Sequence, residues 1–250
     1  MKRIALLLLL LPCLSSAQKL KDILNQAAQQ ATSTVSSAST TSVSTNGLDI
    51  SAGLKEALNK GITKQVSKLT AVDGFYKNEA VKILMPDELQ KVDKALRKMG
   101  MGKLADDGIR SLNRAAEDAV KEATPIFVDG VKNMSFTDAK TILLGNDSAA
   151  TTYLKGTTSA PLYAKFSPVV QQSIGKVGAD KIWATIIKQY NSLPFVSKIN
   201  PDITDYVTNK ALDGVFKMIA VEEKNIRGNL AFRSTDLLKQ VFALQDKKKK

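Results

Sequence analysis

Residues 200–228, NPDITDYVTNKALDGVFKMIAVEEKNIRG, decide the fold class. Asn200-Pro201-Asp202 forms a helix start, and Gly228 follows as a stop signal. Between them, apolar or small residues return every three or four positions, which is the period of one helix face. These residues are Val207, Ala211, Gly214, Val215 and Met218. The stretch predicts one amphipathic helix, the longest of the chain, that ends near Arg227.

The same period recurs over most of the chain from Gly47 to about Gln245. Strand signals are nearly absent, and the one candidate, Val81–Met85, is expected to lie extended in a connection. The sequence therefore predicts a single all-α domain, an irregular multi-helix bundle of about eight to ten helices. Further helices are expected from Pro86 to Gly100, 103–123, near 126–134, from the Ser135–Asp138 capping box to Leu144, 149–155, 162–174 with Pro168 kinking or splitting it, near 182–190, and near 237–242.

The first residues, MKRIALLLLLLPCLSSAQ, have the pattern of a secretory signal peptide. Two basic residues precede an apolar run that is shorter than the roughly 20 residues needed to span a bilayer. Small residues precede Gln18, so we expect cleavage after Ala17 and a periplasmic or secreted protein. A lipoprotein anchored through Cys13 is the alternative, but Pro12 stands where such sites require a small residue.

Two segments separate this predicted signal peptide, 1–17, from the predicted domain, 47–245. Residues 18–31 form a short amphipathic stretch, and 32–46 read as a linker because eleven of the fourteen residues from Thr32 to Thr45 are Ser or Thr. Residues 246–250 form a basic tail. Without Lys2 and Arg3, 34 basic residues face 24 acidic ones. Such a charge suits an anionic membrane surface, but the basic residues are scattered, so nucleic acid is not an expected partner.

Cysteine and histidine limit the possible chemistry. The chain has no histidine, and its one cysteine, Cys13, leaves with the signal peptide if cleavage occurs after Ala17. The mature protein would then have no disulfide, no thiol nucleophile, no Cys/His zinc site and no Ser-His-Asp triad. The sequence predicts no catalytic residue, metal ligand or cofactor.

The dipeptide Asp-Gly occurs three times, at 73–74, 129–130 and 213–214. The first pair follows a helix expected from the apolar positions Leu54 to Leu69, and it is expected to form a turn. The other two lie inside helical periodicity, where a glycine costs about 1 kcal/mol relative to alanine unless close packing offsets it. Different mechanical roles therefore explain the repeat better than a repeated functional site.

Two clusters of charged residues are the candidate binding sites. Arg114 and Glu117 can share one helix face, as can the group Glu222, Glu223 and Arg227. Carboxylates would be the available general acids, general bases or hard-cation ligands in a chain without histidine. Ion pairing that ties helices together is the simpler interpretation. The speculative binding residues are Arg114, Glu117, Asp138, Glu222, Glu223, Arg227, Trp183 and Tyr190.

Several blocks together resemble a bacterial exported family catalogued only as a domain of unknown function. They include GLKEAL (53–58), DGFYKNEAVKI (73–83), NRAAEDA (113–119), PIFVDGVKNM (125–134) and, as the most specific, ALDGVFKMIAVEE (211–223). The resemblance implies a helical, exported domain and carries no catalytic residue. The family often has a proline after the segment EEKNIR (222–227), where this chain has Asn229-Leu230.

These observations favour a non-enzymatic cell-envelope protein that binds an apolar ligand or another envelope protein in a groove between helices. Phe166, Trp183 and Tyr190 are possible wall residues, with core packing as the simpler role for them. A hydrolase or metal-dependent enzyme that uses carboxylates such as Glu117 or Asp138 is the first alternative. Association with an anionic membrane surface is the second.

Overall fold

The computed structural model describes residues 50–98, 100, 102–176 and 202–248, together with isolated positions between 180 and 198. The predictions for residues 1–49, and those for Trp183 and Tyr190, therefore lie outside the described residues. Chain contacts separate Met1–Val43 from Ser44–Lys250, and every described element belongs to the second unit.

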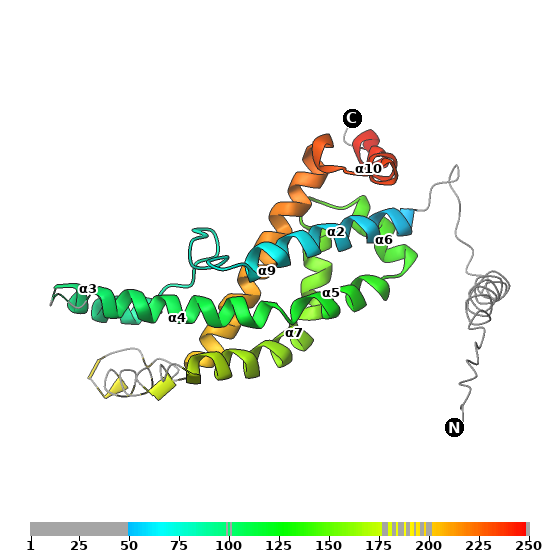
Figure 1. Cartoon of the computed structure of the whole chain (residues 1–250). Coiled ribbons are helices and arrows are strands. Elements are labelled where there is room, and N and C mark those ends of the chain that lie inside the picture. Colours follow the sequence, from blue (N-terminus) through cyan, green and yellow to red (C-terminus); the bar gives the residue numbers. More distant parts are fainter. Residues whose placement is uncertain are drawn as a thin grey trace, which may run out of the picture. The chain divides into compact units, whose positions relative to one another are not determined.

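The described residues form helices and no strands, which confirms the all-α prediction (Figure 1). In chain order the α-helices are α2 (Ile50–Thr70), α3 (Gln90–Lys98), α4 (Gly102–Val120), α5 (Ala123–Lys132), α6 (Phe136–Leu143), α7 (Ala149–Lys176), α9 (Ile203–Gly228) and α10 (Asp236–Lys248). Two 3-10 helices, η1 (Asp87–Leu89) and η2 (Leu230–Phe232), precede α3 and α10. No helix of the described residues is long and apolar enough to cross a membrane.

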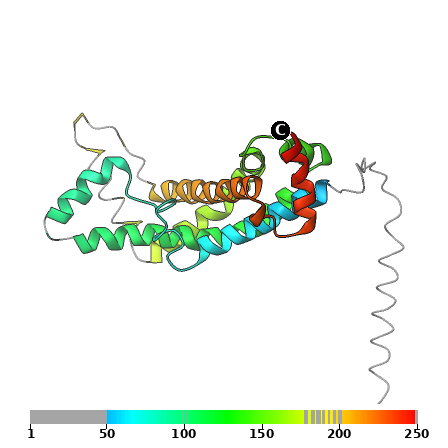
Figure 2. The same ribbon diagram turned by 90° about the horizontal axis from the view of Figure 1, so that it is seen from above.

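Helices α2, α4, α7 and α9 carry most of the packing. Helix α9 packs on α2, α4 and α7, and α2 also contacts α5, α6 and α10. Figure 2 shows α9 and α2 from above, with α10 beside the first turns of α2. The predicted apolar face of residues 200–228 is buried here, because Val207, Ala211 and Val215 are fully enclosed.

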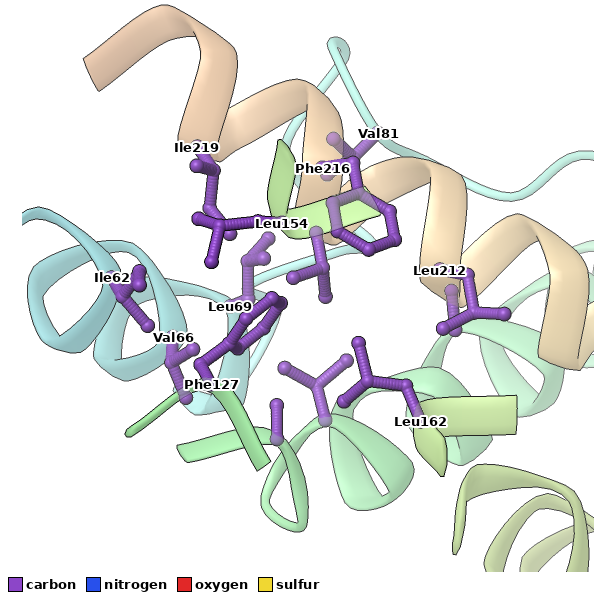
Figure 3. Packing of buried hydrophobic residues seen from close by; sticks show 14 of the residues in the cluster. Ile62, Val66, Leu69, Val81, Phe127, Leu154, Leu162, Leu212, Phe216 and Ile219 are labelled. Atoms are coloured by element: carbon purple, nitrogen blue, oxygen red, sulfur yellow. The ribbon is translucent and has the colours of Figure 1, made fainter. Parts of the chain in front are cut away.

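The core lies where side chains from these helices meet (Figure 3). The rings of Phe127 on α5 and Phe216 on α9 meet edge to face, with centroids 5.8 Å apart. Phe166 is fully buried, so it has the core role rather than that of a groove wall. The buried core thus joins helices that are distant in sequence.

Helix α7 differs from the sequence prediction. Residues 149–155 and 162–174 were expected as separate helices, whereas the structure has one helix of 28 residues that contains Pro161 and Pro168. It is also longer than α9, which has 26 residues. A proline inside a helix costs about 3 kcal/mol, but the turns around the two prolines bury four apolar side chains at helical spacing. These side chains are Leu162, Phe166, Val170 and Ile174.

The helix boundaries show a smaller difference at Pro125. A helix was expected from 103 to 123, stopping before this proline, but α4 ends at Val120 and Pro125 lies in the first turn of α5. The first turn tolerates proline because its N–H groups have no partner within the helix. The capping box that opens α6 has both bonds between Ser135 and Asp138 that the sequence predicts.

The first Asp-Gly pair forms a turn and the other two lie inside helices, as the sequence predicts. Asp73 has a positive φ of 67°, and Gly74 is at a turn where a Cβ atom would lie 2.4 Å from the Lys68 carbonyl oxygen. Gly130 lies against Thr158, and Gly214 lies against the Phe75 ring, each at a distance that leaves no room for a side chain.

Candidate functional site

The charged cluster on α4 holds the connection between α2 and α3. The Glu117 carboxylate accepts hydrogen bonds from the Phe75 N–H at 3.0 Å and, more weakly, from the Tyr76 N–H at 3.4 Å. The Arg114 guanidinium contacts both Glu117 and Asp73, and the hydrogen bond with Glu117 raises the pKa of Arg114. Because Glu117 is only 4% exposed, its charge needs these partners. The cluster therefore fixes the turn at Asp73.

Asn113, on the same face of α4, binds the next part of this connection. Its side-chain oxygen accepts from the Ile83 N–H, and its side-chain nitrogen donates to the Ile83 carbonyl, both at 2.8 Å. The same nitrogen also donates to the Ile109 carbonyl at 2.7 Å. Asn113 is fully buried. Its amide satisfies the backbone N–H and carbonyl of Ile83, as a neighbouring strand would in a sheet.

The charged cluster on α9 connects two other helices. The Glu223 carboxylate accepts from the N–H groups of Ala150 and Thr151 at the start of α7, at 2.9 and 2.8 Å. The Arg227 guanidinium donates to the carbonyls of Ile142 and Leu143 at the end of α6, at 2.8 and 3.1 Å. Each charge thus lies at the helix end whose dipole it complements.

Glu222 faces the other side of α9, toward α2. Its two carboxylate oxygens accept from the Lys64 amine at 2.6 Å and the Gln65 amide at 2.7 Å. The Lys64 amine also lies over the Phe232 ring, 4.9 Å from its centroid. The buried carboxylate and the aromatic ring together hold this lysine in place.

Asp138 is separate from both clusters. It closes the capping box of α6, and its hydrogen bonds from the Ser135 hydroxyl and N–H hold the pKa of Asp138 below the ordinary value. Six of the eight candidate residues are thus described, and they occupy three places in the fold. Among the described residues, no group of three Cys, Asp or Glu side chains is arranged to hold a metal ion.

A groove beside Glu222 is the candidate binding site. It lies between α2, α9, η2 and α10 and has a volume of about 300 Å³. We call it the α2–α10 groove. Its residues are Ala57, Lys60, Gly61, Lys64, Glu222, Ile226, Ala231, Phe232, Ser234 and Leu238. Its volume is at the lower end of the range for ligand pockets, which is about 300–1,000 Å³.

A small cavity lies next to this groove and shares Ala57, Gly61, Glu222 and Ile226 with it. The cavity measures about 20 Å³ and is otherwise surrounded mainly by core side chains such as Leu54, Ile62 and Phe242. Gly61 lines both spaces and has no side chain, and a Cβ atom there would lie 3.3 Å from the Glu222 side chain. The groove and the cavity are therefore neighbours, and three of the four residues that they share are apolar or glycine.

Comparison with known protein families shows which family the chain belongs to. A family model described as "Protein of unknown function (DUF4197)" matches residues 44–243, which is most of the chain. The chain belongs to this family. No curated protein and no solved structure matches the chain.

Two features of this DUF4197 domain are not predicted by the sequence. The first is the α2–α10 groove, because Lys60 and Lys64 resemble any other exposed lysines and Phe232 follows them much later in the chain. The second is Arg233, which is 3% exposed and donates to the carbonyls of Ile226 and Arg227 at the end of α9. A basic residue just after a helix end was the available signal for it.

Proposed function

We propose that this protein is an exported, non-enzymatic binding protein of the cell envelope, and that its α2–α10 groove holds the apolar chain of an anionic amphiphile. The ligand class is a linear acyl chain that ends in a carboxylate or a phosphate. The leader-like first 17 residues support export, to the periplasm or the outside of the cell.

The composition of the groove is the observation that carries the proposal. Its walls and floor are largely apolar, with Ile226, Phe232 and Leu238 among them, while Lys60 and Lys64 provide two amines. Lys60 pairs with Glu56 at 2.8 Å and Lys64 with Glu222 at 2.6 Å, and the side chains of these lysines are 49% and 44% exposed. An ammonium group has three N–H donors, so each amine can also donate to the anionic end of a ligand. Glu222 is the one acidic residue of the groove. A largely apolar groove with two ammonium groups at its edge suits an acyl chain with an anionic end.

The neighbouring cavity supports the same ligand class. Small apolar cavities reduce stability by about 24 cal/mol per Å³, so the 20 Å³ beside Gly61 has a small cost. An apolar group that moves toward this space regains packing contacts that the empty protein lacks. Leu230, 66% exposed, follows α9 on η2, next to the groove residues Ala231 and Phe232.

The buried carboxylates favour binding over the catalytic alternative. Glu117, Glu222 and Glu223 each face a basic side chain and accept further hydrogen bonds that hold helices or loops together. A carboxylate that acts as a general acid or base must reach a substrate proton. Glu222 alone of these three lines the groove, and Lys64 and Gln65 occupy its oxygens.

Titration calorimetry on the mature protein tests the proposal, with laurate and dodecyl phosphate as probes and dodecyltrimethylammonium as the cationic control. We expect both anions to bind and the cation not to bind. The variant Ala231→Trp places a large ring in the groove from an exposed position and should weaken binding at least tenfold. The control Ala164→Trp, at an exposed position on α7, should leave it unchanged.

Two results would overturn the proposal. One is that neither anion binds to the wild-type protein. The other is that Ala231→Trp binds the probes as tightly as Ala164→Trp. If only one of the two anions binds, the site still takes an acyl chain, and the result identifies a carboxylate or a phosphate as its natural end group.

A further inference from the structure

The connection between α2 and α3 has a second groove beside it. After the turn at Asp73, residues 82–86 run without regular secondary structure between α4 and α9. Asn113 of α4 binds this segment at Ile83, and the Tyr206 hydroxyl of α9 donates to the Leu84 carbonyl at 2.9 Å. The segment is thus anchored from both sides.

The hydrogen bonds define two edges of the segment. In extended backbone, the N–H and C=O of one residue point to the same edge, and those of its neighbours point to the opposite edge. Both groups of Ile83 point to Asn113, so the Lys82 carbonyl and the polar groups of Leu84 point away from α4. The Lys82 N–H donates to the Asn78 carbonyl at 2.8 Å. The bond from Tyr206 to the Leu84 carbonyl agrees with this, because Tyr206 belongs to α9.

This second edge has unused hydrogen-bonding groups. The Leu84 N–H and the Lys82 carbonyl have no hydrogen-bond partner within the part of the chain that the structure describes. Leu84 is also 52% exposed, which is high for a large apolar residue. An unpaired donor and acceptor on one extended edge form a template for another extended chain.

Space for such a chain lies directly beside the edge. A groove of about 310 Å³ is bounded by residues 80–85 on one side and by α9 on the other. The α9 residues that line it are Tyr206, Lys210, Asp213, Gly214 and Lys217. Gly214 of α9 lies against Phe75 and Val81, so the start of the connection packs closely on α9 here.

The charges of this second groove favour an acidic partner. Lys82, Lys210 and Lys217 line it, against the two acids Asp87 and Asp213. Asp87 already accepts a hydrogen bond from Gln90 at 2.8 Å. The Lys82 amine lies 3.9 Å from the exposed Glu79 carboxylate, and the Lys210 amine lies over the Tyr206 ring. Lys210 and Lys217 thus have no carboxylate partner within the described residues and can pair with carboxylates that project from a bound chain.

We propose that this groove binds an extended acidic peptide, which pairs its backbone with the Leu84 N–H and the Lys82 carbonyl. One residue of a parallel peptide can satisfy both groups, as in a parallel sheet. The acidic side chains of the peptide then lie near Lys210 and Lys217. This site is separate from the α2–α10 groove and does not depend on the ligand proposed there.

A pair of Leu84 variants tests the backbone pairing. Leu84→Pro removes the N–H while keeping an extended backbone, and Leu84→Ala removes the side chain but keeps the N–H. The probe is a pool of capped hexapeptides in which apolar residues alternate with aspartate or glutamate, and the control pool has lysine or arginine instead. We expect the acidic pool to bind the wild type and Leu84→Ala, and to bind Leu84→Pro at least tenfold more weakly.

Amide exchange of the wild-type protein gives a second measurement that does not need a folded proline variant. The acidic pool should slow hydrogen exchange at the Leu84 amide and leave the Ile83 amide, already bonded to Asn113, unchanged. The proposal is overturned if the acidic pool does not bind, if the basic pool binds as well, or if exchange at Leu84 is unaffected. Equal binding by the proline and alanine variants also overturns it.

Discussion

Glu223 and Arg227 are one turn apart on α9 and form a buried ion pair at 2.9 Å, which connects the end of α6 to the start of α7. Breaking such a pair leaves an uncompensated buried charge, which costs about 3–5 kcal/mol. We therefore expect Glu223→Gln to lower the free energy of unfolding by about this amount. Urea denaturation followed by circular dichroism measures it.

The control for this variant is Asp107→Asn. Asp107 also pairs with an arginine, Arg110, but its side chain is 49% exposed, and exposed pairs contribute about 0–1 kcal/mol. A loss at Glu223 no larger than that at Asp107 would show that the pair does not hold α6 and α7 together.

Asn113 should be equally important for the connection between α2 and α3. Asn113→Ala leaves the N–H and carbonyl of Ile83 without partners, and we expect a loss of about 2–3 kcal/mol together with faster hydrogen exchange at the Ile83 amide. Asn209→Ala is the matched control, because that exposed amide bonds only within its own helix turn. An unchanged exchange rate at Ile83 would contradict the assigned role.

Replacing two glycines in helix interiors by alanine should change the stability of the protein in opposite directions. At Gly214 a Cβ atom would lie 2.6 Å from the Phe75 ring, so Gly214→Ala should cost about 1–3 kcal/mol through overpacking. At Gly156 nothing lies within 4 Å, so Gly156→Ala should stabilise α7 by about 0.5–1 kcal/mol. Thermal denaturation compares both variants, and a change of the same sign at the two positions would refute the packing difference.

The capping box of α6 predicts a dependence on pH. Ser135→Ala should cost about 1 kcal/mol at pH 7, since the hydroxyl caps the helix. The folded pKa of Asp138 is lowered, so the stability from its bonds is complete above the ordinary value of 3.8 and is lost as the pH falls below it. The difference between wild type and variant should therefore shrink from pH 7 to pH 3. A difference that is equal at both pH values would be inconsistent with this linkage.

The sequence predicts the helices well because the apolar period is a local signal. Val207, Ala211 and Val215 belong to one face whatever packs against them, and the capping box at Ser135 is complete within four residues. Helix α7 shows the limit of local signals. Its two prolines favour a break, and the helix stays continuous where it packs on other helices, chiefly α4 and α9.

The candidate site was less predictable, because sequence spacing identifies partners on the same helix but not partners on other helices. Positions three or four apart pair Arg114 with Glu117 and Glu223 with Arg227, as the simpler interpretation expected. Spacing could not show that Glu223 caps α7 or that Glu222 reaches Lys64, because those partners lie on other helices. The α2–α10 groove depends wholly on such distant contacts.

Paramagnetic broadening in the amide spectrum of the protein tests the central proposal most directly. Laurate that carries a nitroxide on its chain should broaden the amide signals of Gly61, Phe232 and Leu238, which line the α2–α10 groove, and leave those of Ala80 and Asp213 sharp. Unlabelled laurate in excess should restore the signals. Broadening that avoids the groove residues, or an unchanged spectrum, would contradict a ligand in the α2–α10 groove.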